Sequence, residues 1–351
     1  MRAILWLGRE PSYIRHDVII RGLRANGVEL AICADTNRNM VIRFLKTLPQ
    51  FIKATRKPHD FVWAGFFGHP LVPFARIFTP KPILFDAWLS SYETMVHARK
   101  SIWGKSIGAL FFKWLDRFAA KCSDLTILAS EGERNYFVHK LGIPAEKTAV
   151  VLIGANTENF VIQKKKKQSK TIVIFIGTFL PISGVETILR AAKHLEKNRE
   201  VEIWIVGDGQ MGAANRKLAE ELGLQNIKFL GKKPYSEVPS LLNQADIALG
   251  IFGSGEKANR ILPTKMYEAM ALAKPSITAR SEGVQEILTD GKSVVMVEPH
   301  DDKGLAEKIA WLAKNPQKAV EIGKNAHSIF LAKATPQKIG ERIIELAKEI
   351  R

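Results

Sequence analysis

The chain has 351 residues, of which 46% are hydrophobic and 25% charged, and this composition predicts two folded α/β domains rather than broad disorder. Its formal net charge is +17, with 27 basic and 13 acidic residues in positions 1–170 but 25 and 22 in positions 171–351. A basic first half suits nucleic acid, an anionic membrane surface or a phosphate-bearing substrate. The two cysteines, Cys33 and Cys122, argue against a disulfide framework or a structural zinc site and fit a reducing cytoplasm.

Short apolar runs recur along the chain and alternate with helical patterns, as in 185–195 and 303–313. The first run begins near the N-terminus and predicts a strand rather than a signal peptide, and no run approaches the ~20 residues that span a bilayer. Nearly continuous Val, Ile and Leu predict parallel strands covered on both faces. The predicted strands are 3–7, 28–33, 61–64, 82–85, 125–129 and 149–153, then 171–176, 201–206, 227–230, 246–251, 275–278 and 294–297.

A run of lysines divides the two series of strands and predicts the domain organisation. Clustered like charges stay solvated, so residues 164–170 are interpreted as a linker. The prediction is an N-terminal domain over 1–163 and a C-terminal domain over 171–332. An amphipathic helix within 333–351 is expected to pack back toward the N-terminal domain.

Glycines and polar residues follow the strands of the second half, at the edge where open parallel sheets bind ligands. Glycines let a ligand approach the backbone, and amides at the start of a helix suit an anion. Ordinary turns and a Ser183 N-cap would explain the same residues, so both interpretations stand. The candidate donor-binding residues here are Gly177, Thr178, Ser183, Gly184, Gly207, Asp208, Gly209, Lys233 and Pro234.

The most informative segment follows the strand at 246–251 and carries Lys257 and Arg260 into a helix that begins near Thr264. Two cations and the positive end of a helix favour a diphosphate. Glu268 shares a helix face with Thr264 and suits a pair of ribose hydroxyls, with Lys265 three residues before it. A Glu–Lys surface pair is the alternative that the spacing leaves open.

Four segments, in this order and spacing, resemble the retaining glycosyltransferases of family 4, which have the GT-B architecture. They are 177–186, 207–209, 263–271 (PTKMYEAMA) and 274–278. The resemblance implies an α/β fold of two Rossmann-like, doubly wound parallel-sheet domains that face each other across a cleft. Thr178 and Ser183 stand where the family often has a basic pair, and Arg260 stands where it often has a first glutamate. We expect Lys257, Arg260 and Lys265 to supply the phosphate charge instead.

The resemblance also implies transfer with retention from a nucleotide-sugar donor, with the leaving phosphate helping to deprotonate the acceptor. No Asp-x-Asp motif occurs in the sequence, so neither a metal nor any other cofactor is expected. Gly8 is a candidate for close approach to the donor phosphates, and an ordinary strand-end glycine is an equal alternative. Asp86 and His97 lie where the family places acceptor or sugar contacts, although an isolated histidine is more often structural.

Two basic, apolar stretches, 40–57 and 106–121, have the composition of segments that lie in a membrane interface. For the second stretch, a helix with a core-facing apolar stripe and a solvated basic face is preferred. For the first stretch, this interpretation and a membrane-interface segment carry equal weight. Together with the charge asymmetry, they suggest an enzyme on the cytoplasmic face of a membrane, acting on a glycan or lipid-linked acceptor.

Other functions remain as alternatives. A sugar-nucleotide epimerase would share the fold and act without an acceptor, whereas a glycogen-type phosphorylase is disfavoured because the chain lacks room for its extra elements. A non-catalytic nucleotide-binding homologue is kept open by Thr178, Ser183 and Arg260. A nucleic-acid-binding protein is supported by charge alone, because no aromatic-basic RNA motif occurs, and no nucleic-acid partner is expected.

Overall fold

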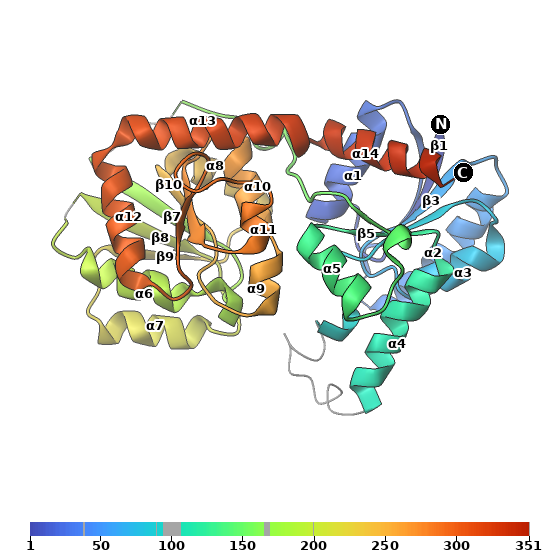
Figure 1. Ribbon diagram of the computed structural model, residues 1–351, viewed down its shortest axis with the longest axis horizontal. Helices are drawn as coiled ribbons and strands as arrows, with labels where there is room; N and C mark the ends of the chain where they lie inside the picture. Colours follow the sequence, from blue (N-terminus) through green and yellow to red (C-terminus); the bar gives the residue numbers. More distant parts are fainter. Residues whose placement is uncertain (38, 89, 94–106, 165–168, 199, 351) are drawn as a thin grey trace. The chain divides into compact units, whose positions relative to one another are not determined.

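The structure, a computed structural model, describes residues 1–37, 39–88, 90–93, 107–164, 169–198 and 200–350. They form two compact units: unit 1, which combines Met1–Gly154 with Thr335–Arg351, and unit 2, Ala155–Ala334 (Figure 1). Each unit contains one six-stranded sheet with parallel pairings throughout. The predicted fold class, two doubly wound parallel sheets, is confirmed, and every predicted strand overlaps an observed one.

The sheet of unit 1 has the order β2-β1-β3-β4-β5-β6 and carries helices on both faces. Its strands are β1 (Arg2–Trp6), β2 (Glu29–Cys33), β3 (Phe61–Ala64), β4 (Ile83–Asp86), β5 (Leu125–Leu128) and β6 (Thr148–Val150). Its helices are α1 (Ile14–Ala25), α2 (Met40–Thr55), α3 (Leu71–Phe78), α4 (Ile107–Cys122), α5 (Glu131–His139) and α14 (Pro336–Glu349), with a 3₁₀ turn at Ala145–Lys147.

Alternate side chains of β1 belong to two different hydrophobic cores, one on each face of the sheet. Ala3 and Leu5 pack in one core with residues of α1 and α14, whereas Ile4 and Trp6 pack in another with residues of α2, α3, α4 and α5. Successive side chains of a strand point to opposite faces, so both faces of β1 have to be apolar. Figure 1 shows α1 and α14 side by side over the first face. They approach closely, because a Cβ on Gly340 would lie 2.2 Å from the carbonyl oxygen of Gly22.

The sheet of unit 2 has the order β12-β11-β10-β7-β8-β9. Its strands are β7 (Thr171–Ile176), β8 (Val201–Val206), β9 (Ile227–Gly231), β10 (Ile247–Leu249), β11 (Ser276–Ala279) and β12 (Val295–Val297). Its helices are α6 (Val185–His194), α7 (Gly212–Glu221), α8 (Val238–Gln244), α9 (Glu256–Arg260), α10 (Thr264–Ala271), α11 (Glu282–Gln285), α12 (Asp302–Lys314) and α13 (Pro316–Lys333), with 3₁₀ turns at Pro181–Ser183 and Tyr235–Glu237.

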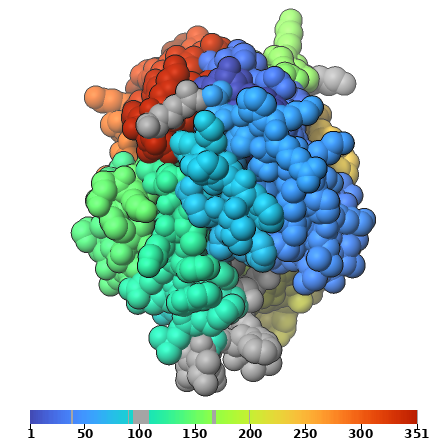
Figure 2. Space-filling view, turned by 90° about the vertical axis from the view of Figure 1, so that its right-hand side faces the viewer, coloured from blue at the N-terminus to red at the C-terminus, as the bar shows by residue number. Residues whose placement is uncertain are grey.

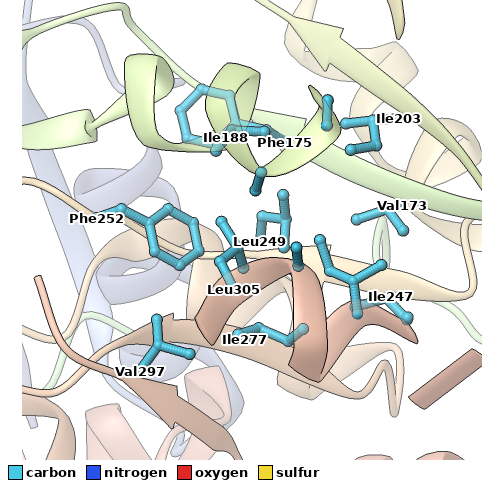
Figure 3. Packing of buried hydrophobic residues seen from close by; sticks show 14 of the residues in the cluster. Val173, Phe175, Ile188, Ile203, Ile247, Leu249, Phe252, Ile277, Val297 and Leu305 are labelled. Atoms are coloured by element: carbon cyan, nitrogen blue, oxygen red, sulfur yellow. The ribbon is translucent and has the colours of Figure 1, made fainter. Parts of the chain in front are cut away.

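The central strands of unit 2, β7 and β10, are neighbours although they are far apart in the sequence. Figure 3 shows their side chains, Phe175 and Leu249 among them, packed with Ile188 of α6 and Leu305 of α12. From β7 the chain adds β8 and β9 on one side, and from β10 it adds β11 and β12 on the other. The carboxyl ends of β7 and β10 therefore form the switch point at which such sheets bind ligands.

The chain passes from unit 1 to unit 2 after Gly154, earlier than the predicted linker at 164–170. The reason is a side chain of α8: Asn243 donates a hydrogen bond to the carbonyl of Val161 and accepts one from the amide of Gln163. These bonds attach the stretch before the lysines to unit 2. Residues 165–168 of the predicted linker lie outside the described residues. At the other end, unit 2 extends to Ala334 and the C-terminal helix belongs to unit 1.

Asp86, the last residue of β4, is fully buried in an ion pair with Arg15 of α1. The Arg15 guanidinium donates to both carboxylate oxygens, at 3.1 and 3.2 Å, and its Nη1 donates to the carbonyls of Val151 and Leu152 after β6. The arginine thus connects α1, β4 and the chain beyond β6. The expectation that Asp86 contacts an acceptor finds no support here, because the carboxylate is enclosed.

We predict that Asp86→Ala destabilises unit 1 by about 3–5 kcal/mol, because it leaves the Arg15 charge buried without its partner. Thermal unfolding measures the loss. Asp17→Ala, which removes a partly exposed partner of Arg21 on α1, is the matched control and should cost no more than about 1 kcal/mol. An Asp86→Ala protein with a wild-type unfolding curve would contradict the structural role.

Candidate functional site

The loops after β7, β8 and β10 pack backbone against backbone through glycines. A Cβ on Gly207 would lie 1.9 Å from the carbonyl oxygen of Gly177, and a Cβ on Gly209 would lie 2.8 Å from the amide nitrogen of Phe179. Gly184, with a left-handed φ of 61°, would place a Cβ 2.5 Å from the amide nitrogen of Gly253. These three glycines are therefore explained by the close approach of the loops to one another.

Three further residues of these loops were expected to contact a donor. The hydroxyl of Ser183 is buried and donates to the carbonyl of Thr178 at 2.7 Å, so it closes the turn. Ser183 is not the N-cap of α6 either, because Gly184 occupies that position and no side chain caps the helix. Thr178 itself is exposed, and Asp208 pairs with Arg216 of α7 at 3.1 Å.

Lys265, in the first turn of α10, lies beneath the first of these loops. Its Nζ is 3.6 Å from the centroid of the Phe175 ring, and a Cβ on Gly177 would lie 2.7 Å from it. The ammonium is thus placed at the carboxyl end of β7 by a helix distant in the sequence. Burial lowers the pKa of Lys265 to about 7, although the Glu268 carboxylate acts in the opposite direction.

Glu268 lies one turn further along α10 and is also buried. Tyr235 lies in the 3₁₀ turn after β9, and its hydroxyl donates a hydrogen bond to Oε1 of Glu268 at 2.9 Å. Burial raises the pKa of Glu268 to about 7, against the effects of this hydrogen bond and of Lys265. The alternative of a Glu–Lys surface pair is not supported, because Glu268 is buried and Lys265 is half-buried.

The two remaining cations lie on α9, a short helix, where the sequence indicated a loop. Arg260 is largely buried, and its Nη1 lies 3.4 Å from Oε2 of Glu256 one turn earlier. Neither α9 nor α10 has a side-chain N-cap: Gly255 and Pro263 precede them without such a hydrogen bond. No side chain thus competes for the amides at these helix starts, a known location for anions.

A pocket of about 360 Å³ lies beside α9, between the loops that follow β10 and β11. Its polar lining includes Ser254, Asn259, Arg280 and Ser281. Arg280 is oriented by Asp290 and Glu298, at 2.8 and 2.9 Å. The sequence analysis did not select these residues, although Arg280 and Ser281 directly follow a predicted strand and could have been found by that signal.

Other predicted donor residues take less enclosed positions. Lys233 and Pro234 are exposed after β9, with the Lys233 Nζ 3.7 Å from Glu237, and Thr264 begins α10 half-buried. In unit 1, a Cβ on Gly8 would lie 2.3 Å from the carbonyl oxygen of Phe66, so close packing explains this glycine. His97 lies outside the described residues.

Unit 1 has an aromatic cluster at the carboxyl ends of β1, β3 and β4 that the sequence analysis missed. Phe66 lies 5.2 Å from Tyr13 and 5.0 Å from Trp88 between ring centroids, and the Arg9 guanidinium lies 4.6 Å from the Tyr13 ring. Phe67 has a left-handed φ of 63°, which is uncommon for a bulky residue and indicates a constrained loop. No simple spacing identifies the cluster, because its members come from three loops.

Several known proteins are similar to this chain. Residues 156–329, nearly all of unit 2, match the family model of glycosyl transferases group 1. An uncharacterized glycosyltransferase of Methanocaldococcus jannaschii is 27% identical over 62% of this chain and 56% of its own length. The alpha-D-kanosaminyltransferase of Streptomyces kanamyceticus is 21% identical over 68% and 64%. The chain thus matches less than two thirds of the length of these relatives.

Solved structures resemble the whole chain. Anabaena HepE in complex with UDP has a TM-score of 0.72 at 17% identity, over 99% of both chains. Sucrose-phosphate synthase from Thermosynechococcus elongatus has a TM-score of 0.76 at 16% identity, over 100% of this chain and 99% of that one. Residues 156–329 therefore match the glycosyl transferases group 1 family, and the whole chain has the GT-B fold of these solved structures.

Proposed function

We propose that the protein transfers a hexosyl group, with retention, from a nucleoside-diphosphate sugar to a glycan or lipid-linked acceptor in the biosynthesis of a surface polysaccharide. No metal or other cofactor takes part. The observation that carries the proposal is Lys265, whose ammonium lies beside Gly177 and over the Phe175 ring at the switch point of the unit 2 sheet. A partly desolvated ammonium is stabilised by an anionic ligand, so a donor diphosphate would complete the site.

The donor diphosphate would lie between Lys265 and the uncapped amides at the start of α10, with Lys257 and Arg260 adding charge from α9. Low-dielectric surroundings strengthen such interactions, and the groups are in place before the reaction begins. Glu268, oriented by Tyr235, would accept hydrogen bonds from the ribose hydroxyls. The pocket lined by Asn259 and Arg280 would receive the sugar.

Transfer breaks the bond between the anomeric carbon and the diphosphate oxygen and forms one to the acceptor oxygen on the same face. The acceptor proton moves to the departing phosphate oxygen, so no protein base is required. Lys265 and the α10 amides stabilise the charge that develops on the leaving group. Retention rests on the resemblance to family 4, and the absence of a protein base follows from that mechanism.

A thermal-shift screen with UDP, GDP, ADP and their sugars tests donor binding. UDP and UDP-glucose come first, because Anabaena HepE has been solved with both. A ligand at 100 times its dissociation constant should stabilise the protein by about 2.7 kcal/mol. No shift with any nucleotide sugar would refute the proposal. Release of an epimerised sugar nucleotide without an acceptor would identify the epimerase, and binding without transfer the non-catalytic homologue.

We predict that Glu268→Gln weakens the best nucleotide sugar by about 10–100-fold, because a hydrogen bond to a charged group contributes about 1.5–3 kcal/mol. The matched control uses the 2′-deoxy form of the same donor. It should bind wild-type protein more weakly than the ribose form does, and it should show a smaller further loss with Glu268→Gln. Equal losses for both donors would place Glu268 away from the ribose.

We predict that Lys265→Met lowers donor affinity at least about 100-fold without lowering the melting temperature. The folded state binds the Lys265 proton less tightly than the unfolded state, so the lysine is a cost to stability at pH 7 that the apolar variant removes. Thermal unfolding and titration with the donor measure the two effects. Lys308→Met, which changes an exposed lysine of α12, should alter neither. A Lys265→Met protein that is less stable but still binds donor would show that Lys265 supports the fold rather than the donor.

A further inference from the structure

Three neighbouring helices of unit 1 expose an unusual number of large apolar side chains. The most exposed are Val41 and Leu45 of α2, Ile77 of α3 and Leu110 of α4, at 66, 62, 73 and 70%. Trp114 of α4 is 53% exposed. The others on these helices are Met40, Ile42, Phe74, Phe78, Phe111 and Phe118. The preference for a core-facing stripe on α4 is therefore wrong.

These side chains belong to one surface, because α3 contacts both α2 and α4. The rings of Phe44 and Phe74 join α2 to α3 at 4.9 Å between centroids. Along α4, Trp114 stacks on Phe118 at 4.9 Å and lies 6.1 Å from Phe111. Figure 2 looks onto this surface, with α2 in blue, α3 in cyan and α4 in blue-green. We call it the α2–α3–α4 face.

The charges on the same helices have one sign. The three sequences contain seven basic residues and a single acidic one, Asp116. Asp116 is fully buried, where it accepts a hydrogen bond from Ser90 at 2.6 Å and pairs with His69 at 2.9 Å. The α2–α3–α4 face therefore presents apolar and cationic groups without an exposed carboxylate from these helices.

Some of these cations lie within the helices, such as Lys46 of α2 and Arg117 of α4, and others lie at the helix ends. Lys53 near the end of α2 and Lys121 near the end of α4 are exposed, and Arg56 and Lys57 follow α2. Apolar side chains, an exposed tryptophan and lysines are the composition of surfaces that enter the boundary between headgroups and acyl chains. A second copy of this face would bring like charges together, which opposes dimerisation.

We propose that the α2–α3–α4 face docks on an anionic lipid bilayer, with its apolar side chains in the interface and its cations on the headgroups. The inference rests on the proposed function, since it names the surface from which the enzyme would reach a lipid-linked acceptor. None of the helices in the described ranges is long and apolar enough to cross a bilayer, so the attachment is peripheral for this part of the chain.

Flotation with vesicles tests the docking. Wild-type protein should float with phosphatidylcholine vesicles that contain about one third phosphatidylglycerol, at low salt, and at least about tenfold less with phosphatidylcholine alone. High salt should weaken flotation, because the charge contribution is screened. Failure to float with the anionic vesicles would overturn the proposal.

The variant Ile77→Glu/Leu110→Glu/Trp114→Glu replaces three exposed side chains and should reduce flotation at least about tenfold. The matched control, Trp311→Glu/Leu331→Glu, changes exposed apolar residues of unit 2 and should float as wild type. Unfolding curves confirm that both variants are folded. Undiminished flotation of the triple variant would overturn the proposal, as would a wild-type dimer that this variant dissociates.

The donor screen separates this inference from the proposed function. The triple variant should keep the nucleotide-sugar thermal shift, because the changed residues lie in unit 1 and the proposed phosphate and ribose ligands, Lys265 and Glu268, lie in unit 2. Flotation without any nucleotide-sugar binding would refute the transferase proposal and leave the docking surface in place. Nucleotide-sugar binding without flotation would refute the docking surface and leave the transferase proposal in place.

Discussion

The position of the Lys265 ammonium at the end of β7 is the constraint on which the candidate site depends. The side chain crosses from α10 to lie beside Gly177 and above Phe175, so three elements have to meet for the charge to be placed there. A Cβ at position 177 would lie 2.7 Å from the ammonium, so a larger residue there would displace the Lys265 side chain. The family to which the resemblance points often carries cations within this loop, whereas this chain supplies one from another element.

Much of the architecture followed from local sequence. Continuous Val, Ile and Leu runs located the strands because both faces of each sheet are covered, and α10 begins at Thr264, where the sequence predicted a helix start. The same local information could not distinguish a ligand-binding glycine from one that permits loop packing. Gly207 meets Gly177 only in the folded structure, and Asp86 meets Arg15 across 71 positions of sequence. Long-range partners of this kind leave no periodic signal.

The two units face different physical demands. In unit 2, polar and charged groups converge at the carboxyl edge of the sheet, where enclosure shifts the pKa values of Lys265 and Glu268 toward neutrality. In unit 1, the Arg15–Asp86 pair is enclosed while the α2–α3–α4 face leaves apolar side chains in water. The sequence of α4 is apolar on several sides, so its periodicity could not decide which side turns to the core.

The most direct test of the central claim is the proton balance of donor binding, measured by calorimetry in buffers of different ionisation enthalpy. At about pH 8, free Lys265 is largely neutral and must take up a proton to face the diphosphate. At about pH 6, Glu268 is largely protonated and must release a proton to accept the ribose hydroxyls. The account predicts net uptake at the higher pH and net release at the lower one. Binding heats that do not depend on the buffer at either pH would contradict it.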